Sequence, residues 1–216
     1  MAFVRQSYYR HVFSNQARKE QLQEGLQITN CAFEGSFIAA NGKFVAFCTK
    51  GAGGFTVLKH DQKGRLPSDI PKIDAHQAYV LDLQWNPYDD NMIASCSEDG
   101  KIKIWNIKDV GLITNTEESL ICLDHHQKRC VQLAWHPAAN NILMSVSQDP
   151  QVVVWNLYQG DAVKIIDGFP DIIWNAAWSS KGDKIVTSCN DKKFRIHNAR
   201  TGELLIEGKG HQSPKA

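Results

Sequence analysis

The sequence has no marked excess of charge of either sign and no long apolar run. Its 24 lysines and arginines are balanced by 23 aspartates and glutamates, which gives a formal net charge of +1. A protein that binds nucleic acid needs a cationic excess to neutralise phosphates, so we predict no nucleic-acid partner. No stretch approaches the roughly 18 apolar residues of a transmembrane segment, and Arg5 and Arg10 interrupt the N-terminal run, which excludes a secretory signal. We therefore predict a cytoplasmic location.

What the sequence does contain is an internal repeat. Three ten-residue segments, HQAYVLDLQW, HQKRCVQLAW and FPDIIWNAAW, each end in tryptophan. These tryptophans are 50 and 43 residues apart, close to the period of about 40–45 residues that is typical of WD propeller blades. The aligned residues are Trp85, Trp135 and Trp178.

Each repeat has the pattern of short β-strands. Residues 80–85 alternate in polarity, residues 92–96 form a second apolar run, and Asp99-Gly100 is a tight turn before the alternating residues 101–107. Asp149-Pro150 and Asp191-Lys192 occupy the same turn in the later units, and residues 44–48 and 55–58 fit a weaker first unit. No long segment keeps the helical period of 3.6 residues. We predict an all-β WD-repeat β-propeller.

A set of polar residues recurs with the repeat. Histidine, serine, aspartate and tryptophan are expected to satisfy one another in a buried relay, because a buried polar group needs a hydrogen-bond partner. A catalytic triad would occur once, whereas this set occurs at the repeat period, so we predict no enzyme. The last unit departs from the pattern, with Phe169, Cys189 and His197 in the histidine, serine and tryptophan positions, and we expect its relay to be broken. The predicted relay residues are His76, Ser97, Asp99, Trp105, His126, Ser147, Asp149, Trp155 and Asp191.

Three other patterns have simpler explanations. Cys122, His125, His126 and Cys130 could ligate zinc, but His126 belongs to the relay and Cys130 leads into a strand, so we predict no metal. The GAGG run at residues 51–54 lacks the GK[ST] ending of a phosphate loop, so it indicates a hairpin turn and no cofactor. The remaining cysteines in apolar runs are expected to be reduced, buried thiols.

The N-terminal stretch VRQSYYRHVF, residues 4–13, closely resembles the opening signature of the coronins. The resemblance continues through each tryptophan repeat and covers essentially the whole chain. It implies a seven-bladed propeller when complete, of which this chain would hold about four blades. A unique region and an oligomerising coiled coil would be absent from this chain, which would make it a fragment, a partial gene model or a short isoform.

The expected organisation follows from the repeat and the resemblance. Residues 1–13 would form a strand that closes the propeller, and residues 14–73 a degenerate first blade. Residues 74–123, 124–166 and 167–209 would form the second, third and fourth blades. Residues 210–216 resemble the start of a fifth repeat.

The resemblance implies binding to F-actin at the actin cortex of the cytoskeleton, and the family also engages the actin-branching complex and cofilin. Coronins carry an arginine in the first blade that is implicated in filament binding, and Gln27 occupies that position here. The alternative is a generic WD-repeat scaffold for signalling or trafficking complexes. Candidate partner-binding residues are Arg5, Arg10, Arg18, Lys19, Gln27, Lys101 and Lys103, and further basic side chains expected on the surface are Lys181, Lys192, Lys193 and Arg195.

Overall fold

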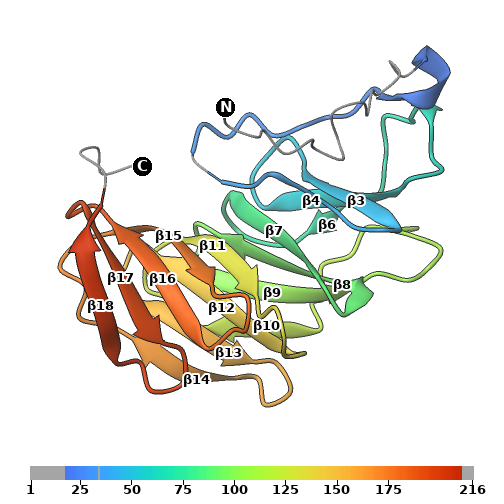
Figure 1. Cartoon of the computed structure of the whole chain (residues 1–216). Helices are drawn as coiled ribbons and strands as arrows, with labels where there is room; N and C mark the ends of the chain where they lie inside the picture. The colour runs from blue at the N-terminus through green and yellow to red at the C-terminus, as the bar shows by residue number, and fades with distance from the viewer. Residues whose placement is uncertain (1–17, 34, 211–216) are drawn as a thin grey trace, which may run out of the picture.

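The computed structural model describes residues 18–33 and 35–210, and nearly all of the strand residues in this range belong to four antiparallel sheets of four strands. The sheets follow one another in chain order, from blue to red in Figure 1. The predicted all-β propeller fold is confirmed. The predicted closing strand 1–13, with Arg5 and Arg10, and residues 211–216 lie outside the described residues. Within the described part, no helix is both long and apolar enough to cross a membrane.

The four sheets are four blades, each of which is a meander of neighbouring strands. The first blade contains β2 (Ile38–Ala40), β3 (Phe44–Cys48), β4 (Gly54–Lys59) and β6 (Ile73–Asp74). The second contains β7 (Val80–Asn86), β8 (Asp89–Ser97), β9 (Lys101–Asn106) and β10 (Ile121–Asp124). The third contains β11 (Cys130–Trp135), β12 (Ile142–Ser147), β13 (Val152–Asn156) and β14 (Asp161–Ile166). The fourth contains β15 (Ile173–Trp178), β16 (Lys184–Cys189), β17 (Lys193–Asn198) and β18 (Leu204–Lys209).

A small additional layer lies beside the first blade. It contains the 3-10 turn η1 (Lys19–Gln21) and two short parallel strands, β1 (Gln23–Glu24) and β5 (Gly64–Arg65). The pairing brings together segments about 40 residues apart in the sequence. This layer therefore places the N-terminal part of the described chain against the β4–β6 connection.

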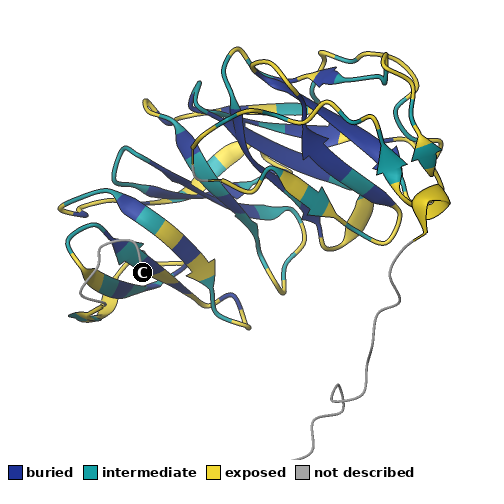
Figure 2. Ribbon diagram, turned by 90° about the horizontal axis from the view of Figure 1, so that it is seen from above, coloured by how far each residue is buried: buried dark blue, intermediate teal, exposed yellow. Residues whose placement is uncertain are grey.

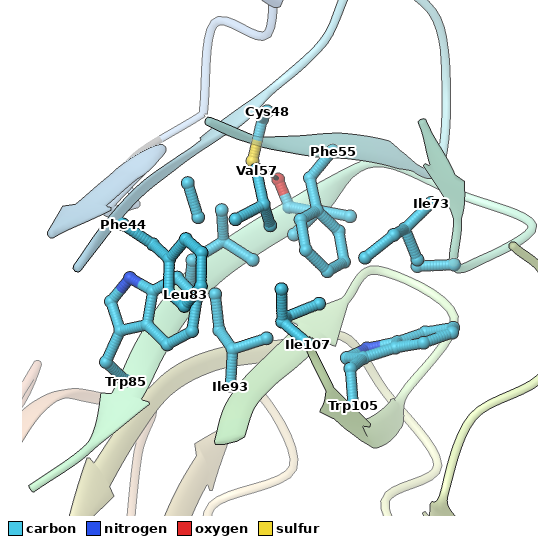
Figure 3. Close-up of a cluster of buried hydrophobic side chains, with 13 residues drawn as sticks. Phe44, Cys48, Phe55, Val57, Ile73, Leu83, Trp85, Ile93, Trp105 and Ile107 are labelled. Carbon is cyan, nitrogen blue, oxygen red and sulfur yellow. Dashed lines mark hydrogen bonds between the residues drawn. The ribbon is translucent and has the colours of Figure 1, made fainter. Parts of the chain in front are cut away.

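The apolar core is divided among the joints between blades. One cluster joins the first two blades, a second joins blades two and three, and a third joins blades three and four. Figure 3 shows the first joint, where Phe44 and Phe55 meet Trp85 and Trp105 across the gap between the sheets. Seen from above in Figure 2, buried residues run through the inner sheets, while the fourth sheet has more exposed positions. Each blade therefore buries its faces only with the help of its neighbours.

Each joint is also linked by a tryptophan side chain. In blades two to four, the indole N–H at the end of the innermost strand donates a hydrogen bond to a backbone carbonyl of the preceding blade. This explains why tryptophan ends each repeat, because a buried indole needs a partner. The bonds are Trp85 to Ala39 (3.1 Å), Trp135 to Gln84 (3.0 Å) and Trp178 to Ala134 (3.0 Å).

A second link recurs two residues before each tryptophan. There, a backbone N–H donates to an oxygen of the preceding blade, and the acceptor differs from joint to joint. The bonds are Leu83 N–H to the Ser36 carbonyl (3.3 Å), Leu133 N–H to the Asp82 carboxylate (2.7 Å) and Ala176 N–H to the Gln132 side-chain oxygen (2.8 Å).

Two hairpin positions require glycine, because the backbone of the next blade lies too close to them for a Cβ atom. Gly53 and Gly100 have φ angles of +77° and +78°, and an added Cβ would lie 1.7 Å from the His76 carbonyl oxygen and 2.7 Å from that of His126. The predicted recurrence of this turn is only partial. Lys192 does adopt a positive φ of 64°, whereas the ring of Pro150 cannot reach that region.

We predict that Gly53→Ala destabilises the protein by about 2–4 kcal/mol, because it adds left-handed strain and a clash with backbone. Urea unfolding would measure the loss. Gly42→Ala is the control, since a Cβ at Gly42 would meet nothing within 4 Å. Equal stability of the two variants would contradict the close contact between Gly53 and the second blade.

Candidate functional site

The polar relay of the second blade is centred on Ser95. His76 Nε2 and Ser95 Oγ are 2.9 Å apart, and the indole Nε1 of Trp105 donates to the same hydroxyl at 2.9 Å. The other imidazole nitrogen lies 3.1 Å from a carboxylate oxygen of Asp99. These four side chains connect the segment before the blade to the hairpin between β8 and β9.

The third blade repeats this arrangement around Ser145. His126 Nε2 and the indole of Trp155 both lie 2.8 Å from the Ser145 hydroxyl. His126 Nδ1 is 3.4 Å from Asp149, a looser contact than in the second blade. Burial lowers the pKa of His126, and the nearby Asp149 carboxylate only partly offsets this effect.

The prediction that Ser97 and Ser147 belong to the relay was wrong. Both hydroxyls lie two residues further along the strand, where they accept the backbone N–H of Asp99 and Asp149 respectively. Ser97 also donates to the Ala78 carbonyl. Since alternate residues of a strand face the same side, the repeat alone could not show which serine meets the rings.

The fourth blade has a different buried network. Thr187 occupies the position of Ser95 and Ser145, and its hydroxyl donates to the Arg195 carbonyl at 3.4 Å. The rings of Phe169 and His197 pack edge to face at 5.1 Å. Asp191 binds the guanidinium of Arg195, which also contacts Glu207 at 2.9 Å.

Arg195 was therefore wrongly predicted to be on the surface. It is only 6% exposed, so its charge is compensated within the blade and is not available to a partner. Asp191, with a pKa lowered by its hydrogen bond to Arg195, belongs to this ion pair and not to a histidine relay.

The residues of the candidate zinc cluster lie in different environments. Cys122 is exposed on β10, whereas Cys130 is buried and His126 contacts Ser145. Across residues 18–33 and 35–210, no group of three His, Cys, Asp or Glu side chains has an arrangement suited to a metal ion. Cys48, Cys96 and Cys189 are buried free thiols, as predicted.

A cavity of about 660 Å³ lies where the innermost strands of blades two to four converge with Ala32, Phe33, Gly35 and Ser36. The guanidinium of Arg129 lies 4.8 Å from the ring centre of Phe33 and also contacts Glu98 and Gln148. Trp174 lines the same cavity. Six separate segments contribute to it, so the sequence offered no signal for it.

Some of the remaining candidate basic residues contact a neighbouring side chain, and the others form no ion pair. Lys101 is paired with Asp124 at 3.1 Å, and the Lys103 ammonium lies 5.9 Å from the ring centre of Trp105. Lys193 is paired with Glu207. Arg18 and Lys19, in contrast, are exposed at η1 and belong to no ion pair of the described residues.

Comparison with known families identifies the repeats. The model of the WD domain, G-beta repeat, matches residues 68–106, 117–156 and 160–198, together more than half of the chain. The chain belongs to the WD40-repeat family. A second family model, a domain of unknown function (DUF1899), matches residues 2–65 of this WD40-repeat protein.

The predicted resemblance to coronins is also confirmed. Coronin-2B of Mus musculus is 50% identical over 205 residues, covering 94% of this chain and 43% of that protein. Coronin-A of Dictyostelium discoideum is 46% identical over 214 residues, covering 98% of this chain and 48% of that protein. The crystal structure of the WD40 domain from Toxoplasma gondii coronin is similar, with a TM-score of 0.84 and 27% identity over 93% of this chain and 52% of that one. The WD40-repeat chain thus spans less than half the length of these curated relatives.

We predict that Ser95→Ala lowers the free energy of unfolding by about 2–3 kcal/mol, because it leaves the buried His76 and Trp105 without their shared partner. Thr187→Ala should cost about 1 kcal/mol, since it removes one hydrogen bond to backbone. Chemical denaturation of both variants would measure the difference. A larger loss of unfolding free energy in Thr187→Ala than in Ser95→Ala would contradict the relay around Ser95.

Proposed function

We propose that this WD40-repeat protein binds actin filaments, as the coronin resemblance implies, and acts as a non-catalytic scaffold in the cytoplasm at the actin cortex. The identity of about 50% to Coronin-2B supports this assignment. The relay serines support a role without catalysis, because Ser95 and Ser145 are fully buried under the indoles they bind.

The observation that carries the proposal is a cluster of unpaired cations at the additional layer beside the first blade. We name this cluster, made of Arg18, Lys19, Lys63 and Arg65, the basic corner. All four side chains are exposed, and none forms an ion pair with a described residue. The β1–β5 pairing and the contact of β5 with η1 bring them to one place.

The charge of this region is available to a partner. Residues 18–27 and 59–66 together hold five Lys or Arg and three Asp or Glu. Elsewhere, the cations Lys101, Lys193 and Arg195 are neutralised by neighbouring carboxylates. Actin filaments are acidic, so an uncompensated basic surface would accelerate encounter and make binding sensitive to salt.

Gln27 is exposed and lies at the β3–β4 hairpin, where its carbonyl accepts the Lys50 N–H at 3.0 Å. Its carboxamide would hydrogen-bond to a partner without adding charge. In this proposal, Arg18 and Lys19 supply the charge that an arginine at position 27 would give other coronins. The actin-branching complex and cofilin remain further proposed partners.

The prediction is tested by filament co-sedimentation at low and high salt. The quadruple variant Arg18→Glu, Lys19→Glu, Lys63→Glu and Arg65→Glu should weaken binding by at least about tenfold at low salt, because it replaces attraction with repulsion. The wild-type protein should lose affinity as the salt concentration rises.

The control reverses two exposed lysines on the fourth blade, Lys181 and Lys184, and should pellet like the wild type. Circular dichroism would show that both variants are folded. Unchanged pelleting of the basic-corner variant would contradict this filament contact. No pelleting of folded wild-type protein at low salt would favour the generic scaffold.

A further inference from the structure

The three joints between blades use acceptors of different chemistry at the same position. The first joint uses the backbone carbonyl of Ser36, the second the carboxylate of Asp82, and the third the carboxamide of Gln132. Asp82 and Gln132 occupy equivalent positions of β7 and β11, three residues before the tryptophan of each strand. Of these three acceptors, only the carboxylate of the second joint can gain or lose a proton.

Asp82 is held inside this joint and is only 2% exposed. One carboxylate oxygen accepts the Leu133 N–H at 2.7 Å, and the other accepts the side-chain amide of Gln84 at 3.2 Å. No Lys, Arg or His nitrogen of the described chain forms an ion pair with it. A buried carboxylate without a cation is stabilised by its hydrogen bonds alone.

The ionisable groups packed around Asp82 supply no positive charge. Cys48 on β3 and Cys96 on β8 are buried thiols whose pKa values are raised chiefly by burial, so both are neutral. Cys130 on β11 is a third buried thiol, beside Cys96. Arg129 lines the same cavity as Asp82, but its guanidinium is engaged by Glu98 and Gln148.

Burial raises the pKa of Asp82 to about 7, against the opposing effect of the hydrogen bonds from Leu133, Gln84 and Leu83. Asp82 also lines the cavity of about 660 Å³ described above, which gives its proton a route to solvent. The charge state of this joint can therefore follow the pH of the surroundings.

We propose that Asp82 makes the joint between the second and third blades proton-sensitive, so that this joint is tighter in mildly acidic solution and looser in mildly alkaline solution. The protonated form is neutral and has little desolvation cost. The ionised form places an uncompensated charge between two packed sheets. The first and third joints, with neutral acceptors, do not respond in this way.

The direction of this pH effect follows from comparing the protonation of Asp82 in the unfolded and the folded chain. Unfolded Asp82 loses its proton near pH 4, whereas the folded protein keeps it to about pH 7. The stabilisation from the retained proton is complete below the unfolded value and is lost as the pH rises through the folded value. Between about pH 6 and pH 8, the unfolding equilibrium constant should therefore rise about tenfold because of this residue.

The test compares urea unfolding of the wild type and Asp82→Asn at about pH 6 and about pH 8. The carboxamide resembles that of Gln132 and cannot ionise, so the variant should lack the tenfold rise. The histidines are common to both proteins, so any contribution they make cancels in the comparison. Asp69→Asn, the same change at an exposed loop position, should behave like the wild type.

Two further measurements keep the proposal testable if Asp82→Asn folds poorly. Gln132→Glu places a carboxylate in the third joint and should gain a pH dependence of the same sign, smaller because Gln132 is only half-buried. In the wild type, the hydrogen-exchange protection factor of the Leu133 amide should fall between about pH 6 and pH 8, while that of Ala176 stays constant. Equal pH dependence of the wild type and Asp82→Asn, or equal behaviour of the two amides, would overturn the proposal.

Discussion

The structure depends on contact between neighbouring blades. A four-stranded sheet has two faces, and in this chain the apolar residues of one face are covered only by the next sheet along the sequence. The tryptophan at the end of the innermost strand of blades two to four adds a directed hydrogen bond to this packing. Because both the packing and the bond join different blades, the stability of one blade depends on its neighbours.

Within blades, the relay performs a different task. In the second and third blades, it ties the incoming segment to the hairpin between the second and third strands through one serine hydroxyl. The fourth blade replaces it with the ion pairs that the buried Arg195 forms with Asp191 and Glu207. These interactions use His76, His126, the two relay serines and several carboxylates to stabilise the scaffold. The side chains that could contact a partner lie instead at the surface, as in the basic corner, and around the cavity of about 660 Å³.

The sequence predicted the fold well because the strand pattern is local and repeats. It did not predict the correct relay serine, since Ser95 and Ser97 lie on the same face of one strand. The buried state of Arg195 depends on Glu207 from the adjacent strand, which no motif indicates. The basic corner requires β1 to pair with β5 across about 40 residues, and the Asp82 contact requires two blades to meet. Such long-range placements leave no periodic signal.

The most direct test of coupling between blades is Trp135→Phe, which keeps an aromatic ring but removes the indole N–H that reaches the Gln84 carbonyl. We expect native-state hydrogen exchange to show a similar loss of protection, about 1 kcal/mol, in strands of both the second and the third blade. A loss confined to β11–β14, with β7–β10 unchanged, would contradict the claim that the blades stabilise one another.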